Sequence, residues 1–173
     1  MIHDYSNSLF CIIGKPHHGK TRVAEAIAQA LGFKQGSASD IIYEALASQY
    51  AHATGNTVAD CFTMLKKMPK ETIRAELVRV GDDLTRNDPG ALVTALVQRG
   101  CRVIDGIRRC VEIKAARGIF GMETNVWWVM RHPEPPPIAD NTEVTIDDSD
   151  FVILNQYPDV SKLRAAVVQI LLG

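Results

Sequence analysis

The 173-residue chain is long enough to bury one sizeable core, and its 46% hydrophobic and 23% charged residues are typical of an ordinary globular protein. Its formal net charge of −1 argues against a global positive field that would recruit nucleic acid or an acidic membrane. We therefore expect a single domain, residues 1–173, whose partner is a small molecule rather than nucleic acid or a membrane.

Cysteine usage and the apolar runs indicate the cellular setting. None of the four cysteines forms a C-x-x-C pair, which argues against a metal site or a disulfide framework. No run approaches the ~18 apolar residues that would span a bilayer. The N-terminal stretch also lacks the features of a signal peptide. The expected location is the cytoplasm.

Short apolar runs that fit buried strands alternate along the chain with amphipathic helical segments. This alternation predicts a three-layer α/β/α domain with a parallel sheet. The predicted strands are Leu9–Ile13, Cys101–Asp105, Asn125–Met130 and Phe151–Leu154, with a weaker one near Gly32–Gly36. The predicted helices span residues 20–31, 39–50, 70–86, 89–100 and 160–172.

The stretch GKPHHGKT, residues 14–21, lies between the first predicted strand and the first helix. It fills the phosphate-loop pattern G-x-x-x-x-G-K-[ST], in which backbone N–H groups and a helix N-terminus cradle phosphates. Lys20 would reach the β- and γ-phosphates, and the Thr21 hydroxyl would ligate Mg²⁺. The sequence therefore predicts a loop that binds ATP and Mg²⁺, formed by Gly14, Lys15, Pro16, His17, His18, Gly19, Lys20 and Thr21.

Two histidines, His17 and His18, occupy positions where such a loop often has small residues. They keep the backbone N–H donors, so they matter only where one of them takes a positive φ, which His tolerates better than a β-branched residue. Neighbours in sequence rarely converge on one ion, so we do not expect the pair to form a metal site.

The stretch VIDGIRR ends the second strong strand with Asp105, at the sheet edge where ligands gather in open α/β sheets. The Asp105 carboxylate either holds Mg²⁺ or orients the acceptor, or it caps the helix that follows. Arg108 and Arg109 come next. Paired guanidiniums suit an acceptor phosphate, because the planar fork meets its oxygens bidentately, although one of the two could be a plain surface residue.

Residues 131–150, RHPEPPPIADNTEVTIDDSD, are acidic and rich in proline and separate the last two predicted strands. Three consecutive prolines exclude a regular helix. The segment is either a solvated connector or a lid over a substrate site, since long loops in compact domains are often functional.

GKPHHGKT, VIDGIRR, WWVMR and DFVILN, followed by a terminal amphipathic helix, together resemble the P-loop nucleoside monophosphate kinases. The likeness is closest to the deoxynucleoside monophosphate kinases of bacteriophages, with dephospho-coenzyme A kinases as near relatives. It implies a P-loop NTPase fold with an acceptor-binding helical region at about residues 40–90 and a short lid-like loop at about 131–150. It also implies ATP-dependent phosphoryl transfer to a (deoxy)nucleoside monophosphate.

The resemblance also implies roles for single residues. Arg74 and Arg86 lie in the segment that matches the family's arginine helix for the acceptor, and Asp40 resembles the acidic start of the acceptor region. Arg131 matches the lid arginine that contacts the transferring phosphates, and Asn155 matches an asparagine near the nucleotide base. The lid departs from the family pattern, because it is short and acidic and has few arginines.

The expected roles fall into three groups. Catalysis is assigned to Lys20, Asp105, Arg109 and Arg131. Acceptor binding is assigned to Asp40, Arg74, Arg86, Arg108 and Arg109, and the metal to Thr21 and Asp105.

Two other functions remain open: a kinase of another small acceptor, such as dephospho-coenzyme A or a shikimate-like metabolite, and a nucleotide-binding regulatory protein with little turnover. Trp127 and Trp128 belong either to the core or to the subunit contact of a homodimer.

Overall fold

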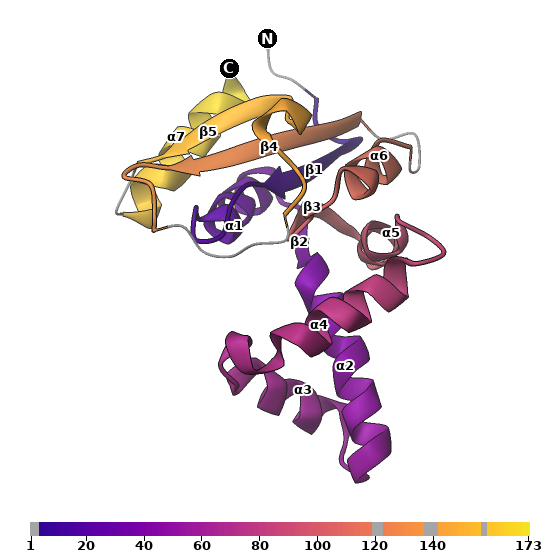
Figure 1. Ribbon diagram of the computed structural model, residues 1–173. Helices are drawn as coiled ribbons and strands as arrows, with labels where there is room; N and C mark the ends of the chain where they lie inside the picture. Colours follow the sequence, from indigo (N-terminus) through magenta and orange to yellow (C-terminus); the bar gives the residue numbers. More distant parts are fainter. Residues whose placement is uncertain (1–3, 119–122, 137–141, 157–158) are drawn as a thin grey trace.

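The computed structural model describes residues 4–118, 123–136, 142–156 and 159–173. Its centre is a five-stranded sheet in the order β2-β3-β1-β4-β5, in which every neighbouring pair is parallel. Figure 1 shows this sheet with helices packed around it. The strands are β1 (Ser8–Ile13), β2 (Lys34–Ser37), β3 (Cys101–Asp105), β4 (Glu123–Arg131) and β5 (Phe151–Asn155).

Helices connect the strands and account for most of the remaining described chain. They are α1 (Lys20–Leu31), α2 (Ala38–Thr54), α3 (Val58–Lys67), α4 (Lys70–Thr85), α5 (Ala91–Gln98), α6 (Cys110–Gly118) and α7 (Val160–Leu172), with a short 3-10 helix at Ile146–Asp148. Among the described residues, no helix combines the length and apolar character needed to cross a membrane.

The apolar run of β1 is buried on both faces of the sheet. Leu9, Cys11 and Ile13 pack in a cluster with side chains of α2, α5 and α6, whereas Phe10 and Ile12 pack in a second cluster with α1 and α7. Burial on both faces explains why β1 and β3 lack clean alternation of apolar and polar residues. The same expectation is wrong for β5, which lies at the edge of the sheet and leaves Phe151, Val152 and Leu154 exposed. The predicted α/β class with a parallel sheet is confirmed, and the helices on both faces are compatible with three layers.

The two tryptophans of β4 are both buried, Trp127 against α1 and α7 and Trp128 in the cluster with α5 and α6. Trp127 also packs its ring against Phe10 and Phe151, with centroids 6.1 and 5.7 Å apart. Both residues therefore belong to the core, which was one of the two alternatives.

Helices α2, α3 and α4 form a helical arm that projects from the sheet in Figure 1. The arm has an apolar cluster of its own, which includes Leu46 from α2, Leu65 from α3 and Ile73 from α4. The sequence predicted α2 and α4 but not α3. Helix α3 begins at a local cap, where Thr57 Oγ1 accepts from the Asp60 N–H at 3.1 Å.

The order of the strands indicates where in the sheet a ligand site is expected. Strands β1 and β3 are neighbours, yet the chain leaves β1 toward β2 at one edge and leaves β3 toward β4 on the far side of β1. In open parallel sheets, ligands bind outside the carboxyl ends of strands at such a reversal. The residues that follow β1 and β3 are therefore the first place to look for a site.

Candidate functional site

The glycine-rich loop, residues 14–19, connects β1 to α1, and its end glycines are required by its geometry. Gly14 has φ +139° and Gly19 has φ +91°. A Cβ on Gly14 would lie 2.5 Å from the Val129 oxygen, and one on Gly19 would lie 2.2 Å from Asn155 Nδ2. The loop thus approaches β4 and β5 so closely that a side chain at either glycine would collide with them.

The two histidines of the loop have different environments. His17 is exposed and has φ +62°, the only positive φ at a non-glycine position among the described residues. His18 is only 4% exposed, and its Nδ1 lies 3.2 Å from the Val129 oxygen and 3.3 Å from the Arg131 nitrogen. Burial lowers the pKa of His18, which favours the neutral ring.

Asn155, at the end of β5, lies under the same loop. Its Nδ2 donates to the His18 carbonyl oxygen at 3.0 Å, and its side chain is buried. In this position the amide fixes the path of the loop, which the sequence did not suggest. The side chain of His18 also fixes the loop against β4, whereas the sequence predicted that only its backbone would matter.

Lys20 and Thr21 form the first turn of α1. Lys20 Nζ donates to the carbonyl oxygens of Gly14 and Lys15, both at 2.7 Å, so its ammonium group lies against the loop. Thr21 is exposed at the helix N-terminus. An N-terminus with a lysine beside it favours a bound anion, because the helix dipole and the ammonium charge act in the same direction.

Asp105 ends β3 and is only 3% exposed. It is paired in register with Ile12 of β1, and Gln35 Nε2 donates to its Oδ2 at 3.4 Å. The alternative role as a helix cap is taken by Glu112, whose Oε2 accepts from the backbone N–H groups of Arg108 and Arg109 at 2.9 and 3.0 Å. The Asp105 carboxylate is therefore not needed as a cap.

A metal at this position would need oxygen ligands from more than one source. Within the described part of the chain, no three His, Cys, Asp or Glu side chains gather closely enough to hold an ion. Asp105 and Thr21 supply a carboxylate and a hydroxyl, which suit Mg²⁺ that keeps several waters and binds phosphate oxygens. By their chemistry, these two oxygen donors suit Mg²⁺ bound together with a phosphate.

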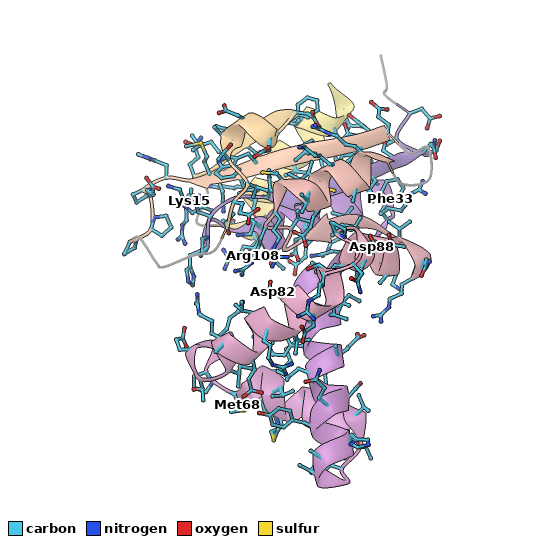
Figure 2. The ribbon with its side chains drawn as sticks, turned by 45° about the vertical axis from the view of Figure 1, so that its right-hand side comes forward. Lys15, Phe33, Met68, Asp82, Asp88 and Arg108 are labelled. Carbon is cyan, nitrogen blue, oxygen red and sulfur yellow. The ribbon has the colours of Figure 1, made fainter. Side chains whose placement is uncertain are left out.

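A cavity of about 130 Å³, here called the arm cavity, lies between the helical arm and the loop after β3. Figure 2 shows two of its lining residues, Arg108 from that loop and Asp82 from α4, near each other where the arm meets the sheet. The lining combines apolar side chains with four cationic and two acidic ones. The residues are Ser39, Ile42, Tyr43, Lys70, Arg74, Leu77, Val78, Gly81, Asp82, Thr85, Leu92, Gly106, Arg108, Arg109 and Glu112.

The structure brings three of the five predicted acceptor residues to this cavity: Arg74, Arg108 and Arg109. The other two lie elsewhere. Asp40 forms an ion pair with Lys66 of α3, and Arg86 is exposed over 70% of its side chain and pairs with Asp83.

Sequence reasoning missed Lys70, Asp82 and Thr85, which line the arm cavity from α4. The signal that could have identified them is helical spacing. Starting from Arg74, steps of three or four residues lead to Lys70, to Leu77 or Val78, to Gly81 or Asp82, and to Thr85 or Arg86. The spacing alone does not separate the last two; in the structure Thr85 lines the cavity and Arg86 does not.

The lid segment, residues 131–150, begins beside the glycine-rich loop. Arg131 Nη1 donates to the His17 carbonyl oxygen at 3.5 Å, and Lys15 Nζ donates to Glu134 Oε1 at 3.0 Å. The hydrogen bond from Lys15 lowers the pKa of the Glu134 carboxyl. Both partners of this ion pair are exposed, so it contributes little to stability.

The other end of the lid segment is hydrogen-bonded to the loop after β3. The Arg108 carbonyl oxygen accepts from the N–H groups of Glu143 at 2.8 Å and Val144 at 3.2 Å, and Val144 is buried. Residues 137–141 of the predicted lid lie outside the described residues. A cavity of about 610 Å³, the lid cavity, opens between the segment and the loop. It is lined by Lys15, Pro16, His18, Trp128, Met130, Glu134, Pro135, Pro136, Thr142, Val144, Thr145 and Ile146.

No protein-family model matches the chain, and no curated protein is similar to it in sequence. The resemblance to nucleoside monophosphate kinases therefore stays a prediction.

Proposed function

We propose that this protein transfers the γ-phosphoryl group of ATP to a nucleoside monophosphate, which gives ADP and the nucleoside diphosphate. The observation that carries the proposal is that two elements suited to anions follow neighbouring strands of the sheet. The glycine-rich loop with Lys20 follows β1, and a cavity with four cationic side chains adjoins the residues after β3. A donor and an acceptor phosphate need such neighbouring sites for in-line transfer.

The loop would hold the donor. Its backbone N–H groups and the N-terminus of α1 are suited to the β- and γ-phosphates, and Lys20 would exchange its bonds to the loop carbonyls for bonds to phosphate oxygens. Thr21 and Asp105 would hold Mg²⁺, which when bound neutralises charge on the β- and γ-phosphates. His18 and Asn155 would keep the loop in place against β4 and β5.

The arm cavity would hold the acceptor. Lys70, Arg74, Arg108 and Arg109 supply the positive charge for its phosphate, and the apolar side chains of α2 and α4 supply a surface for its base. In the reaction, an oxygen of the acceptor phosphate forms a bond to the γ-phosphorus while the bond from this phosphorus to the β,γ-bridging oxygen breaks. The electron pair of that bond leaves with ADP.

The lid segment would complete the site. Arg131 begins the segment beside the loop and is suited to the charge on the transferring phosphoryl group. One described end of the segment is hydrogen-bonded to the loop and the other to the residues after β3. A segment anchored in this way would exclude water when it closes over bound phosphates, which would suppress hydrolysis of ATP.

A panel of acceptors tests the proposal. ADP release is measured with ATP and Mg²⁺ in the presence of each ribo- and deoxyribonucleoside monophosphate, dephospho-coenzyme A or shikimate. The proposal expects release that depends on one or more of the monophosphates. Release only with dephospho-coenzyme A or shikimate would assign another acceptor to the same fold.

One observation favours a second function, a nucleotide-binding regulatory protein with little turnover. The described part of the lid segment has only Arg131 and His132 as basic side chains, against the acids Glu134, Glu143, Asp147, Asp148 and Asp150. Such a lid supplies little charge to a transition state. Tight binding of ATP without release of ADP for any acceptor of the panel would select this function.

A further inference from the structure

Arg109 reaches from the loop after β3 to α4, where two side chains hold its guanidinium. Its Nη1 donates to Thr85 Oγ1 at 2.8 Å, and its Nη2 contacts the Asp82 carboxylate. Thr85 is buried and donates its own hydroxyl proton to the Gly81 oxygen at 2.8 Å, so a lone pair of Oγ1 remains for the arginine. Two contacts to a planar group fix its orientation as well as its position.

The position of Asp82 in its helix indicates that it does not serve α4 itself. Asp82 lies in the last turn of α4, where the helix dipole disfavours a negative charge. The dipole also disfavours the charge of its neighbour Asp83, but Asp83 pairs with Arg79 of α4 and with Arg86 at the C-cap of this helix. Asp82 instead contacts an arginine of another element, so the effect of its charge is on Arg109.

Asp82 could have either of two roles, and they predict opposite effects of its removal on the affinity of the arm cavity for an anion. The cavity has four cationic side chains, and the carboxylates of Asp82 and Glu112 both reduce their total charge. If this reduction were the only effect of Asp82, removal of its charge would tighten the binding of an anion. If Asp82 orients Arg109, its removal would weaken binding, because a freely rotating guanidinium must be ordered at a cost in entropy.

We propose that Asp82, together with Thr85, is a positioning residue that directs Arg109 toward an acceptor phosphate in the arm cavity. This inference rests on the proposed function, since it takes a phosphate group as the ligand. The two contacts engage one N–H of each Nη group. A guanidinium has five N–H donors, so enough of the fork remains for a phosphate.

The test compares Asp82→Asn with Asp82→Glu and with the matched control Asp83→Asn from the same turn of α4. In steady-state kinetics, Asp82→Asn is expected to raise the acceptor KM about tenfold, because it removes the charge that strengthens the hydrogen bond from Arg109 Nη2. The KM for ATP and the melting temperature stay unchanged. Asp82→Glu restores most of the acceptor affinity, and Asp83→Asn behaves like the wild-type chain. An acceptor KM that is unchanged or lower in Asp82→Asn overturns the proposal.

Calorimetric titration with inorganic phosphate separates this proposal from the proposed function, because it needs no turnover. The expected result is phosphate binding by the wild-type chain that weakens in Asp82→Asn but not in Asp83→Asn. That result, with no turnover for any acceptor, would contradict the kinase function and leave the positioning role standing. Equal or tighter binding by Asp82→Asn, or no phosphate binding by the wild-type chain, overturns the positioning role.

Discussion

The glycine-rich loop and the arm cavity follow neighbouring strands, yet the chain forms them in different ways. Consecutive residues form the loop, and its shape depends on Gly14 and Gly19 at its ends. The arm cavity is assembled from α2, α4 and the loop after β3, which are far apart in the sequence. A site formed by consecutive residues leaves a motif in the sequence, whereas a site assembled by folding leaves only helical spacing and charge.

The largest effect is expected from Lys20→Ala, which removes the ammonium group beside the loop. If the proposed function holds, phosphoryl transfer should fall at least about a hundredfold, since the charge would act on the transferring group. The chain should still fold, because Lys20 belongs to no apolar cluster and its ammonium group donates to carbonyl oxygens of the loop. The control is Lys162→Ala, an exposed lysine in α7. Near-normal transfer in Lys20→Ala would show that the loop takes no part in the reaction.

A second test compares glycines of similar backbone conformation. Gly19 and Gly32 flank α1 and both have left-handed φ values, +91° and +67°. A Cβ on Gly32 meets nothing within 4 Å, whereas one on Gly19 meets Asn155 Nδ2 at 2.2 Å. Gly32→Ala should therefore cost only about 1–2 kcal/mol of unfolding free energy.

Gly19→Ala should cost more than Gly32→Ala and should also weaken ATP binding, because it displaces Asn155 from the His18 carbonyl oxygen. Urea unfolding and calorimetric titration with ATP measure the two effects. Equal losses in the two variants would mean that the contact between the loop and β5 does not shape the site.

The arm cavity is tested by Arg109→Ala against Arg86→Ala. Arg109 lines the cavity, so its loss should lower kcat/KM for the acceptor at least about tenfold while the affinity for ATP changes little. Arg86 pairs with Asp83 on the surface, so its loss should change neither. If Arg86→Ala impairs the acceptor step as much as Arg109→Ala does, the acceptor binds outside this cavity.

The smallest effect concerns pH. Burial lowers the pKa of His18 in the folded chain, so the unfolded chain, with a His pKa of about 6.5, takes up this proton more readily. The free energy of unfolding should therefore fall as the pH is lowered from about 6.5 toward the folded-state pKa. His18→Asn should flatten this dependence, whereas His52→Asn, at an exposed site, should keep it. Urea unfolding between pH 5 and 7.5 measures both slopes, and identical slopes for wild type and His18→Asn would contradict the account.

Much of the fold could be predicted because its causes are local. The strands Leu9–Ile13 and Cys101–Asp105 were evident as apolar runs, since both faces of the sheet are covered. Helix α3 was missed because its few buried residues, such as Cys61 and Leu65, pack only within the arm. Its cap at Thr57 is a weak signal when read without that packing.

The site could be predicted only in part, for the same physical reason. The loop motif gives the positions of Gly14, Gly19 and Lys20. The burial of His18 depends on Val129 and Arg131 of a distant strand, so no local pattern indicates it.

The resemblance assigned acceptor binding to Arg86. The next residue back along the helix, Thr85, is the one whose side chain accepts a hydrogen bond from Arg109. A shift of one residue on a helix turns the side chain by about 100°, so likeness between motifs cannot decide which face is used.

The central claim is that the γ-phosphoryl group moves from a donor on the loop to an acceptor in the arm cavity. Phosphorus NMR of ATP and Mg²⁺ with the best acceptor of the panel follows this group directly. We predict that the resonances of ADP and of the acceptor diphosphate grow together in equal amounts, without inorganic phosphate. Growth of ADP with inorganic phosphate alone, or no change with any acceptor, would contradict the claim.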